Sequence, residues 1–166
     1  MNELKYKIII DSREKENKHI IEAFKKNNIE FDTRGLPIGD YIIEGGHKYV
    51  PNVAIERKGS IDELIGNLLD TATKDEKGNN RFARELIRAN QCNKKVILLI
   101  ENGNYYKDLL TGNYRSQIKP KAIRGMIISL EAKYPNLSIV GIDKELVGSY
   151  IHSVLYYRLR EDLKEH

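Results

Sequence analysis

The feature that most constrains the fold is a short run, KVILLI (Lys95–Ile100), in which apolar residues follow one another without a polar break. An unbroken apolar run of this kind is typical of a strand that is covered on both faces. We therefore expect this strand to lie fully buried inside a sheet.

The rest of the chain alternates between strand-like and helix-like segments. Further strands are expected at residues 5–10, 29–33 and 138–142, and in two segments that fold back on each other at Gly45-Gly46 as a hairpin with a long or bulged connection. Helices are expected at residues 17–26, 60–69, 81–90, 121–133 and 144–163. Residues 101–116, rich in Gly, Asn and Tyr, are expected to form a loop. This alternation predicts an α/β fold with a central mixed β-sheet flanked by helices.

Length and composition favour one globular domain spanning residues 1–166, since no repeat or linker divides the chain. No apolar run approaches the roughly 20 residues that a membrane span needs. The single cysteine, Cys92, cannot form an intrachain disulfide and is expected to be a partly buried apolar residue. We expect an intracellular protein, in the cytoplasm, nucleoid or nucleus.

The charge is distributed unevenly, although the net charge of +4 is only mildly basic. Residues 109–130 include basic side chains, among them Lys119 and Lys121, and no acidic one. Residues 74–95 are also predominantly basic. Such segments suggest a polyanionic partner such as nucleic acid, while a solvated surface is the alternative for any single stretch.

The segment VAIERK (Val53–Lys58) runs from apolar residues directly into three ionisable ones. Side chains alternate along a strand, so Glu56 and Lys58 are expected on one face and Arg57 on the other. Asp40, which opens the preceding strand, comes beside Glu56 if the two strands form an antiparallel hairpin. Asp11, at the end of the first strand, can reach the same edge of the sheet.

Carboxylates that converge in this way raise each other's pKa unless a cation lies among them. Oxygen ligands suit Mg²⁺ or Mn²⁺, which polarises a phosphate and lowers the pKa of a bound water. Lys58 would orient that water or stabilise negative charge at phosphorus. The pattern Asp, then Glu-x-Lys, therefore indicates metal-dependent phosphodiester hydrolysis. The alternative is an ordinary Glu56–Lys58 ion pair at the end of a strand.

The chain resembles the nuclease domain of the XPF family of structure-selective endonucleases. The signature of that family is Gly-Asp followed by (Val/Ile)-Glu-Arg-Lys-x-x-x-Asp. Here it stands as Gly39-Asp40, then IERK (residues 55–58) and Asp62. Matching segments in the same order are DSRE (residues 11–14), Arg81-Phe82 and VILLIE (residues 96–101), so that the resemblance spans residues 7–142.

The resemblance implies a restriction-endonuclease-like core and a DNA endonuclease that cleaves branched or single-to-double-strand junction DNA with Mg²⁺ or Mn²⁺. It implies that Asp40, Glu56 and the backbone carbonyl of Arg57 hold the metal. Lys58 would be the catalytic base or charge stabiliser, and Asp11 an accessory ligand.

Three more residues match family positions near this centre. Arg13 and Arg57 match positions that support the site or touch the backbone of the substrate. Asp62 matches the last signature position, but a first-turn carboxylate favoured by the helix dipole explains it equally well.

One departure from the family concerns the helix expected at residues 81–90. Arg81, Arg84 and Arg88 share one face of this helix and are candidates for binding DNA. Family members usually carry glutamine where this chain has Glu85. An acidic residue there weakens the DNA interpretation unless Glu85 joins the active site or pairs with its arginines.

A second departure concerns the grip on DNA. Many relatives append a helix-hairpin-helix module, and the sequence after Ile142 leaves no room for one. We therefore expect the grip to come from the nuclease domain, a second subunit or a partner. Apolar stripes on the two C-terminal helices suit core packing, and the resemblance implies a homodimer that could use them.

Two alternative functions remain open from the sequence. One is a catalytically silent nuclease fold that only binds DNA or a partner subunit. Such a protein is expected to have lost Asp40, Glu56 or Lys58, whereas this chain has all three. The other is an α/β binding domain whose acidic edge is accidental.

Overall fold

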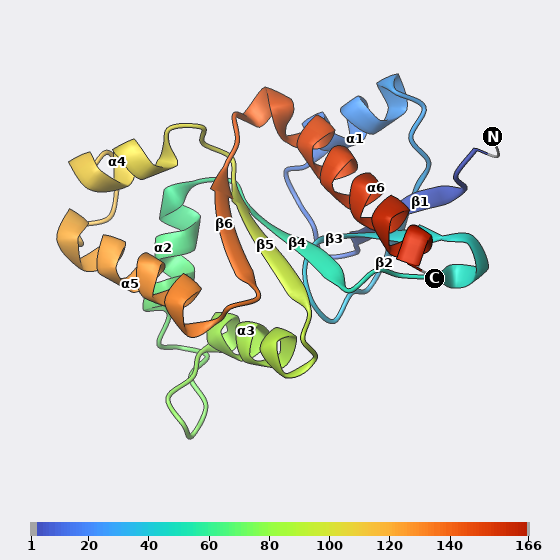
Figure 1. Cartoon of the computed structure of the whole chain (residues 1–166). Coiled ribbons are helices and arrows are strands. Elements are labelled where there is room, and N and C mark those ends of the chain that lie inside the picture. Colours follow the sequence, from blue (N-terminus) through green and yellow to red (C-terminus); the bar gives the residue numbers. More distant parts are fainter. Residues whose placement is uncertain (1–2, 166) are drawn as a thin grey trace.

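The computed structural model describes residues 3–165 and contains one mixed sheet with the strand order β2-β1-β3-β4-β5-β6 (Figure 1). The strands are β1 (Tyr6–Asp11), β2 (Phe31–Arg34), β3 (Tyr41–Gly45), β4 (Val53–Lys58), β5 (Lys95–Ile100) and β6 (Leu137–Gly141). Strand β3 runs antiparallel to β1 and β4, whereas β2 is parallel to β1, and β5 is parallel to β4 and β6. The predicted α/β fold with a mixed sheet is confirmed.

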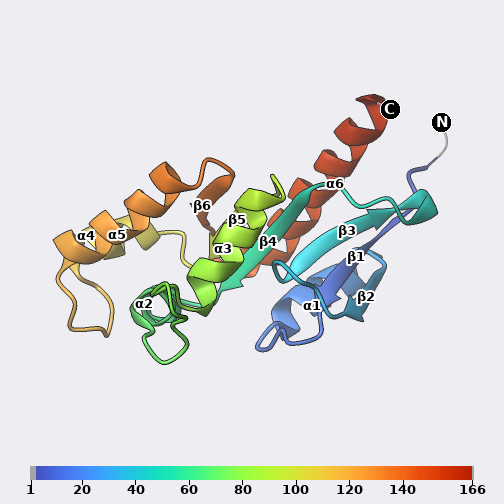
Figure 2. The same cartoon turned by 90° about the horizontal axis from the view of Figure 1, so that it is seen from below.

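Helices cover both faces of this sheet (Figures 1 and 2). They are α1 (Lys18–Lys26), α2 (Ile61–Leu69), α3 (Arg81–Gln91), α4 (Tyr105–Thr111), α5 (Pro120–Lys133) and α6 (Val147–Glu165), with 3-10 turns η1 (Gly46–Lys48) and η2 (Lys144–Leu146). Helices α1 and α6 pack on one face, and α2, α3 and α5 pack on the other. Within residues 3–165, no helix combines the length and the apolar character that a membrane span requires.

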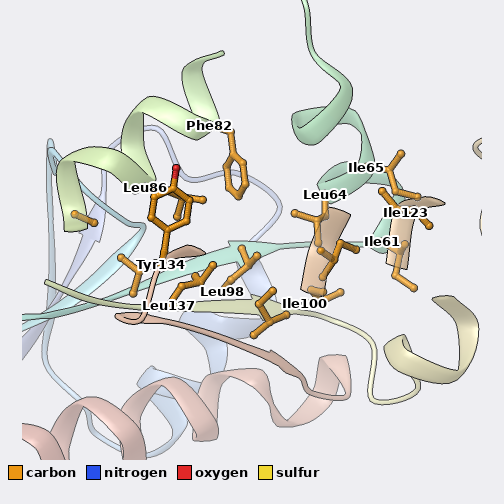
Figure 3. Packing of buried hydrophobic residues seen from close by; sticks show 14 of the residues in the cluster. Ile61, Leu64, Ile65, Phe82, Leu86, Leu98, Ile100, Ile123, Tyr134 and Leu137 are labelled. Carbon is orange, nitrogen blue, oxygen red and sulfur yellow. The ribbon is translucent and has the colours of Figure 1, made fainter. Parts of the chain in front are cut away.

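Strand β5 contributes to the apolar core on both faces, as its unbroken apolar sequence predicts. Ile97 and Leu99 pack with α1 and α6, while Leu98 and Ile100 pack with α2, α3 and α5. Figure 3 shows the second cluster, in which Leu64 of α2 and residues of α3 lie over β5. Burial of a single side chain of this size contributes about 1.5–3 kcal/mol to folding.

Two local expectations are wrong. Residues 101–116 are not entirely a loop, because α4 forms within them around the fully buried Leu109. The Gly and Asn residues that suggest a loop flank this short helix, which ends at Gly112 with φ 77°. Cys92 is exposed rather than partly buried, since it follows the last turn of α3. The remaining expected elements are present with ends shifted by a few residues.

The connection into β3 places Asp40 beside β4. Gly39 has φ 80°, and a Cβ at this position would lie 2.7 Å from the Cβ of Ala54. Only glycine meets both requirements without strain. The next N–H, that of Asp40, donates to the carbonyl of Ile55 at 2.8 Å, which starts the antiparallel β3–β4 pairing. The predicted hairpin is confirmed, with η1 in its connection.

Candidate active site

Asp40, Glu56 and Lys58 line the same cavity of about 630 Å³, where the end of β4 meets α2 and α3. Glu56 and Lys58 lie on the sheet face that α2 and α3 cover, and their side chains approach to 3.3 Å (Nζ to Oε1). The backbone N–H of Arg57 donates to Oδ2 of Asp40 at 2.8 Å, which fixes the aspartate against β4. The alternation of the strand and the hairpin together produce this arrangement.

The carboxyl groups in the cavity are electrostatically unfavourable as anions. Burial raises the pKa of Asp40 to about 7. Burial, followed by the charges of Asp40 and Glu85, raises the pKa of Glu56 to about 9. The Lys58 ammonium favours ionisation of both groups, but it does not offset these effects. A further cation is therefore needed to hold both groups ionised near neutral pH.

Glu85 of α3 belongs to this cavity. Its Oε1 accepts the backbone N–H of Gly39 at 2.9 Å, and its charge raises the pKa of Glu56. Within the described part of the chain, Glu85 forms no ion pair with an arginine of its own helix. Of the two possibilities that the sequence left open, Glu85 therefore joins the candidate site.

Arg57 points to the opposite face of the sheet, as predicted. Its guanidinium lies 2.7 Å from Oε2 of Glu14 and 3.2 Å from Oε1 of Glu101. It also donates to the carbonyl of Lys15 at 2.5 Å, and Nε2 of His19 lies 2.6 Å from Oε1 of Glu101. This network of ion pairs and hydrogen bonds supports the end of β4, although Arg57 and Glu14 also border the cavity. The segments that resemble the XPF family include Glu14 and Glu101, but the resemblance implies no role for either residue.

Asp11 and Arg13 form one wall of the cavity. Asp11 is 4% exposed, and its Oδ1 accepts the N–H of Leu36 at 2.8 Å. Its Oδ2 accepts from Nε of Arg13 at 3.0 Å, and the same guanidinium donates to the carbonyl of Leu36 at 2.8 Å. Both oxygens of Asp11 are therefore engaged in holding the loop before Gly39.

Asp62 lies in the first turn of α2 but does not line this cavity. Its Oδ1 accepts the backbone N–H groups of Arg115 at 2.8 Å and of Ser116 at 3.2 Å. The structure therefore separates Asp62 from the other signature residues and connects it to the loop between α4 and α5.

The candidate DNA-binding residues fall into three groups. Arg81 and Arg88 are exposed and line the cavity. Arg84 instead donates to the carbonyls of Thr73 and Asn79, at 2.8 and 2.7 Å, so its guanidinium is occupied in holding the α2–α3 loop. Lys119 and Lys121 are exposed at the start of α5, outside the cavity.

Comparison with known proteins identifies the family of this chain. The sequence profile described as the ERCC4 domain matches residues 10–154. The chain belongs to the ERCC4 domain family. No curated protein matches this sequence at a significant level.

Solved structures with the same fold include XPF from Aeropyrum pernix, which is 17% identical with a TM-score of 0.66. That comparison covers 96% of this chain and 69% of the other. XPF from Aeropyrum pernix in complex with DNA is 16% identical with a TM-score of 0.64, and the match covers 95% of this ERCC4 domain and 66% of that chain. At this identity the likeness establishes the fold, and together with the family match it supports a nuclease-type function.

The donor groups of this ERCC4 domain fit a hexacoordinate divalent ion that keeps several waters. Within residues 3–165, no three His, Cys, Asp or Glu side chains form a group that could hold a metal by themselves. Mg²⁺ is commonly bound through one or two carboxylates, with waters and phosphate oxygens completing the shell. Asp40, Glu56 and the backbone carbonyl of Arg57 suit that mode, since the two carboxyl groups are buried together and destabilised as uncompensated anions.

Proposed function

We propose that this ERCC4 domain is a metal-dependent endonuclease that hydrolyses phosphodiester bonds in DNA at branches or single-to-double-strand junctions. The proposal depends on one observation, the placement of the largely buried Asp40 and Glu56 beside Lys58 in an open cavity. Two such carboxyl groups are unfavourable as anions on their own, whereas Asp40 and Glu56 would be suitable ligands for a divalent cation that also binds a phosphate.

Each residue has a definite part in this proposal. Asp40, fixed by the N–H of Arg57, and Glu56 would hold Mg²⁺ or Mn²⁺ together with the Arg57 carbonyl. When bound, the metal would polarise the scissile phosphate and acidify a water. The Lys58 ammonium, which lies over the ring of Phe82 at 5.3 Å, would stabilise negative charge on the phosphate oxygens or orient the attacking water.

The surroundings of the cavity support DNA as the substrate. Arg81 and Arg88 are exposed on its rim and suit the phosphates on either side of the scissile bond. Selectivity for branched DNA is proposed from the family resemblance. A homodimer is proposed through the C-terminal helices, where Met126 and Ile128 of α5 and Tyr157 of α6 remain exposed.

The test is cleavage of labelled linear, forked and flapped DNA by the pure protein with Mn²⁺, Mg²⁺ or EDTA. We expect metal-dependent cutting that is lost in Asp40→Asn and reduced by about 10²–10⁴-fold in Lys58→Ala, the usual contribution of an acid–base group. Glu22→Gln, which changes an exposed carboxylate on α1, serves as the matched control.

Two outcomes would contradict the proposal. Cutting that persists in EDTA or in Asp40→Asn excludes the metal mechanism. Binding of forked DNA without any cleavage under all metal conditions would instead favour the catalytically silent alternative.

A further inference from the structure

The segment between α4 and α5 and the first turn of α5 are basic and close to the candidate active site in the fold. Together they carry the exposed side chains of Arg115, Lys119 and Lys121. None of these three forms an ion pair within residues 3–165. A group of unpaired cations on a rigid loop suits a polyanion, because binding releases counterions without breaking internal contacts.

Internal contacts give this loop a fixed shape. The hydroxyl of Tyr114 donates to the carbonyl of Ile118 at 2.6 Å, and the N–H of Ile118 donates to Oγ of Ser116 at 3.2 Å. Gly112, with φ 77°, starts the loop, and a Cβ there would lie 3.2 Å from Cγ of Pro120, the first residue of α5. The basic side chains are therefore presented from a compact turn.

Asp62 connects this turn to the active-site region. Its carboxylate oxygen accepts two successive backbone N–H groups, those of Arg115 and Ser116. Asp62 lies two residues after Ser60, and both Gly59 and Ser60 line the catalytic cavity as well as a neighbouring hollow that Asp62 and Tyr114 border. In Figure 2 the loop between α4 and α5, coloured yellow to orange, projects toward the same edge of the molecule as α2 and the loop that follows it.

We propose that residues 112–121, the loop with the first turn of α5, form a second contact for the DNA backbone, and that Asp62 is the positioning residue that connects this loop to α2. This proposal rests on the proposed nuclease function and adds where the DNA extends beyond the cleavage site. Asp143 and Glu145 make the neighbouring hollow acidic, so a DNA arm follows the basic rim of the loop and avoids the hollow. Asp62 then acts in substrate binding and has no part in holding the metal.

The first experiment separates the two roles of Asp62 by structure and by metal binding. In Asp62→Ala, we expect faster amide hydrogen exchange in a peptide covering residues 112–118, while Mn²⁺ binding measured by calorimetry stays within twofold of the wild type. Asp40→Asn should show the reverse, with weak Mn²⁺ binding and unchanged exchange in the loop. Loss of Mn²⁺ binding in Asp62→Ala with unchanged exchange would make Asp62 part of the metal site and overturn the proposal.

The second experiment tests the loop itself through DNA binding in EDTA, so that it does not depend on cleavage. For the triple variant Arg115→Gln, Lys119→Gln, Lys121→Gln we expect weaker binding of forked DNA. The slope of log K against log salt should fall by about one for each phosphate that the variant no longer neutralises. Lys26→Gln, on the opposite face of the sheet, is the single-site control. Wild-type affinity and slope in the triple variant would overturn the proposal, even if the wild type proves to be an active nuclease.

Discussion

Glu85 of α3 and Glu56 of β4 line the same cavity. Burial and the charges of Asp40 and Glu85 raise the pKa of Glu56 to about 9, so Glu56 is protonated near neutral pH while no cation is present. A glutamine at this position would keep an acceptor for the N–H of Gly39 without adding charge. The acidic Glu85 therefore adds to the pH dependence of the site.

This difference predicts the behaviour of Glu85→Gln. Among the causes that raise the pKa of Glu56, the charge of Glu85 comes after burial and Asp40, so removing it lowers the pKa of Glu56. We expect the acid limb of the profile of kcat/KM against pH to move to lower pH with Mn²⁺. Glu22→Gln should leave the profile unchanged, and a shift toward higher pH would show that Glu85 is needed as a ligand.

At the scale of elements, α2 has a well-defined start just after β4. Oγ of Ser60 accepts the N–H of Glu63 at 3.1 Å, and the carboxylate of Glu63 accepts the N–H of Gly59 at 2.8 Å. Ser60 is thus the N-cap of this helix. These contacts direct the chain away from β4 immediately after Lys58 and set the orientation of α2 beside the cavity.

Removal of the cap should therefore weaken the fold measurably. In Ser60→Ala we expect the free energy of unfolding to fall by about 1 kcal/mol, because a helix N–H loses its partner. Urea denaturation followed by circular dichroism gives this value directly. Ser153→Ala, in an exposed position on α6, should stay within about 0.5 kcal/mol of the wild type. An unchanged midpoint for Ser60→Ala would contradict the capping role.

The elements also show what could be predicted from the sequence. The alternation of VAIERK is local, so the opposite directions of Glu56 and Arg57 could be predicted, and the confirmed hairpin places Asp40 correctly. The position of Glu85 in the cavity could not be predicted, since helical spacing shows which residues share a face of the helix but not which element that face packs against. Asp62 and Arg115 are 53 residues apart in the chain, so no local sequence pattern could predict their contact.

On the scale of the whole molecule, the buried carboxyl groups oppose folding at neutral and alkaline pH. Unfolded Asp and Glu release their protons near pH 4. The folded protein retains protons up to a pKa of about 7 for Asp40 and about 9 for Glu56. Between these limits the native state binds more protons than the unfolded state, so stability falls as the pH rises.

We therefore expect the melting temperature in EDTA to fall between pH 5 and pH 8.5 by more in the wild type than in Asp40→Asn/Glu56→Gln, whose amides do not titrate. Saturating Mg²⁺ should raise the wild-type melting temperature at pH 8 and leave the double variant unaffected, since only the native site binds the ion. Thermal melting across the pH series measures both effects. Parallel curves for the two proteins would exclude the raised pKa values.

The two faces of β4 have a consequence for how such chains diverge. Glu56 serves the cavity, while Arg57, the next residue, neutralises Glu14 and Glu101 in the interior behind it. In the proposed function, Glu56 therefore serves the chemistry, whereas the side chain of Arg57 serves the folding. In a related protein that no longer cleaves DNA, we expect substitutions at Asp40 and Glu56, but retention of Arg57 with Glu14 and Glu101. A retained arginine with both acidic partners, next to a substituted Glu56 position, would then indicate descent from a nuclease.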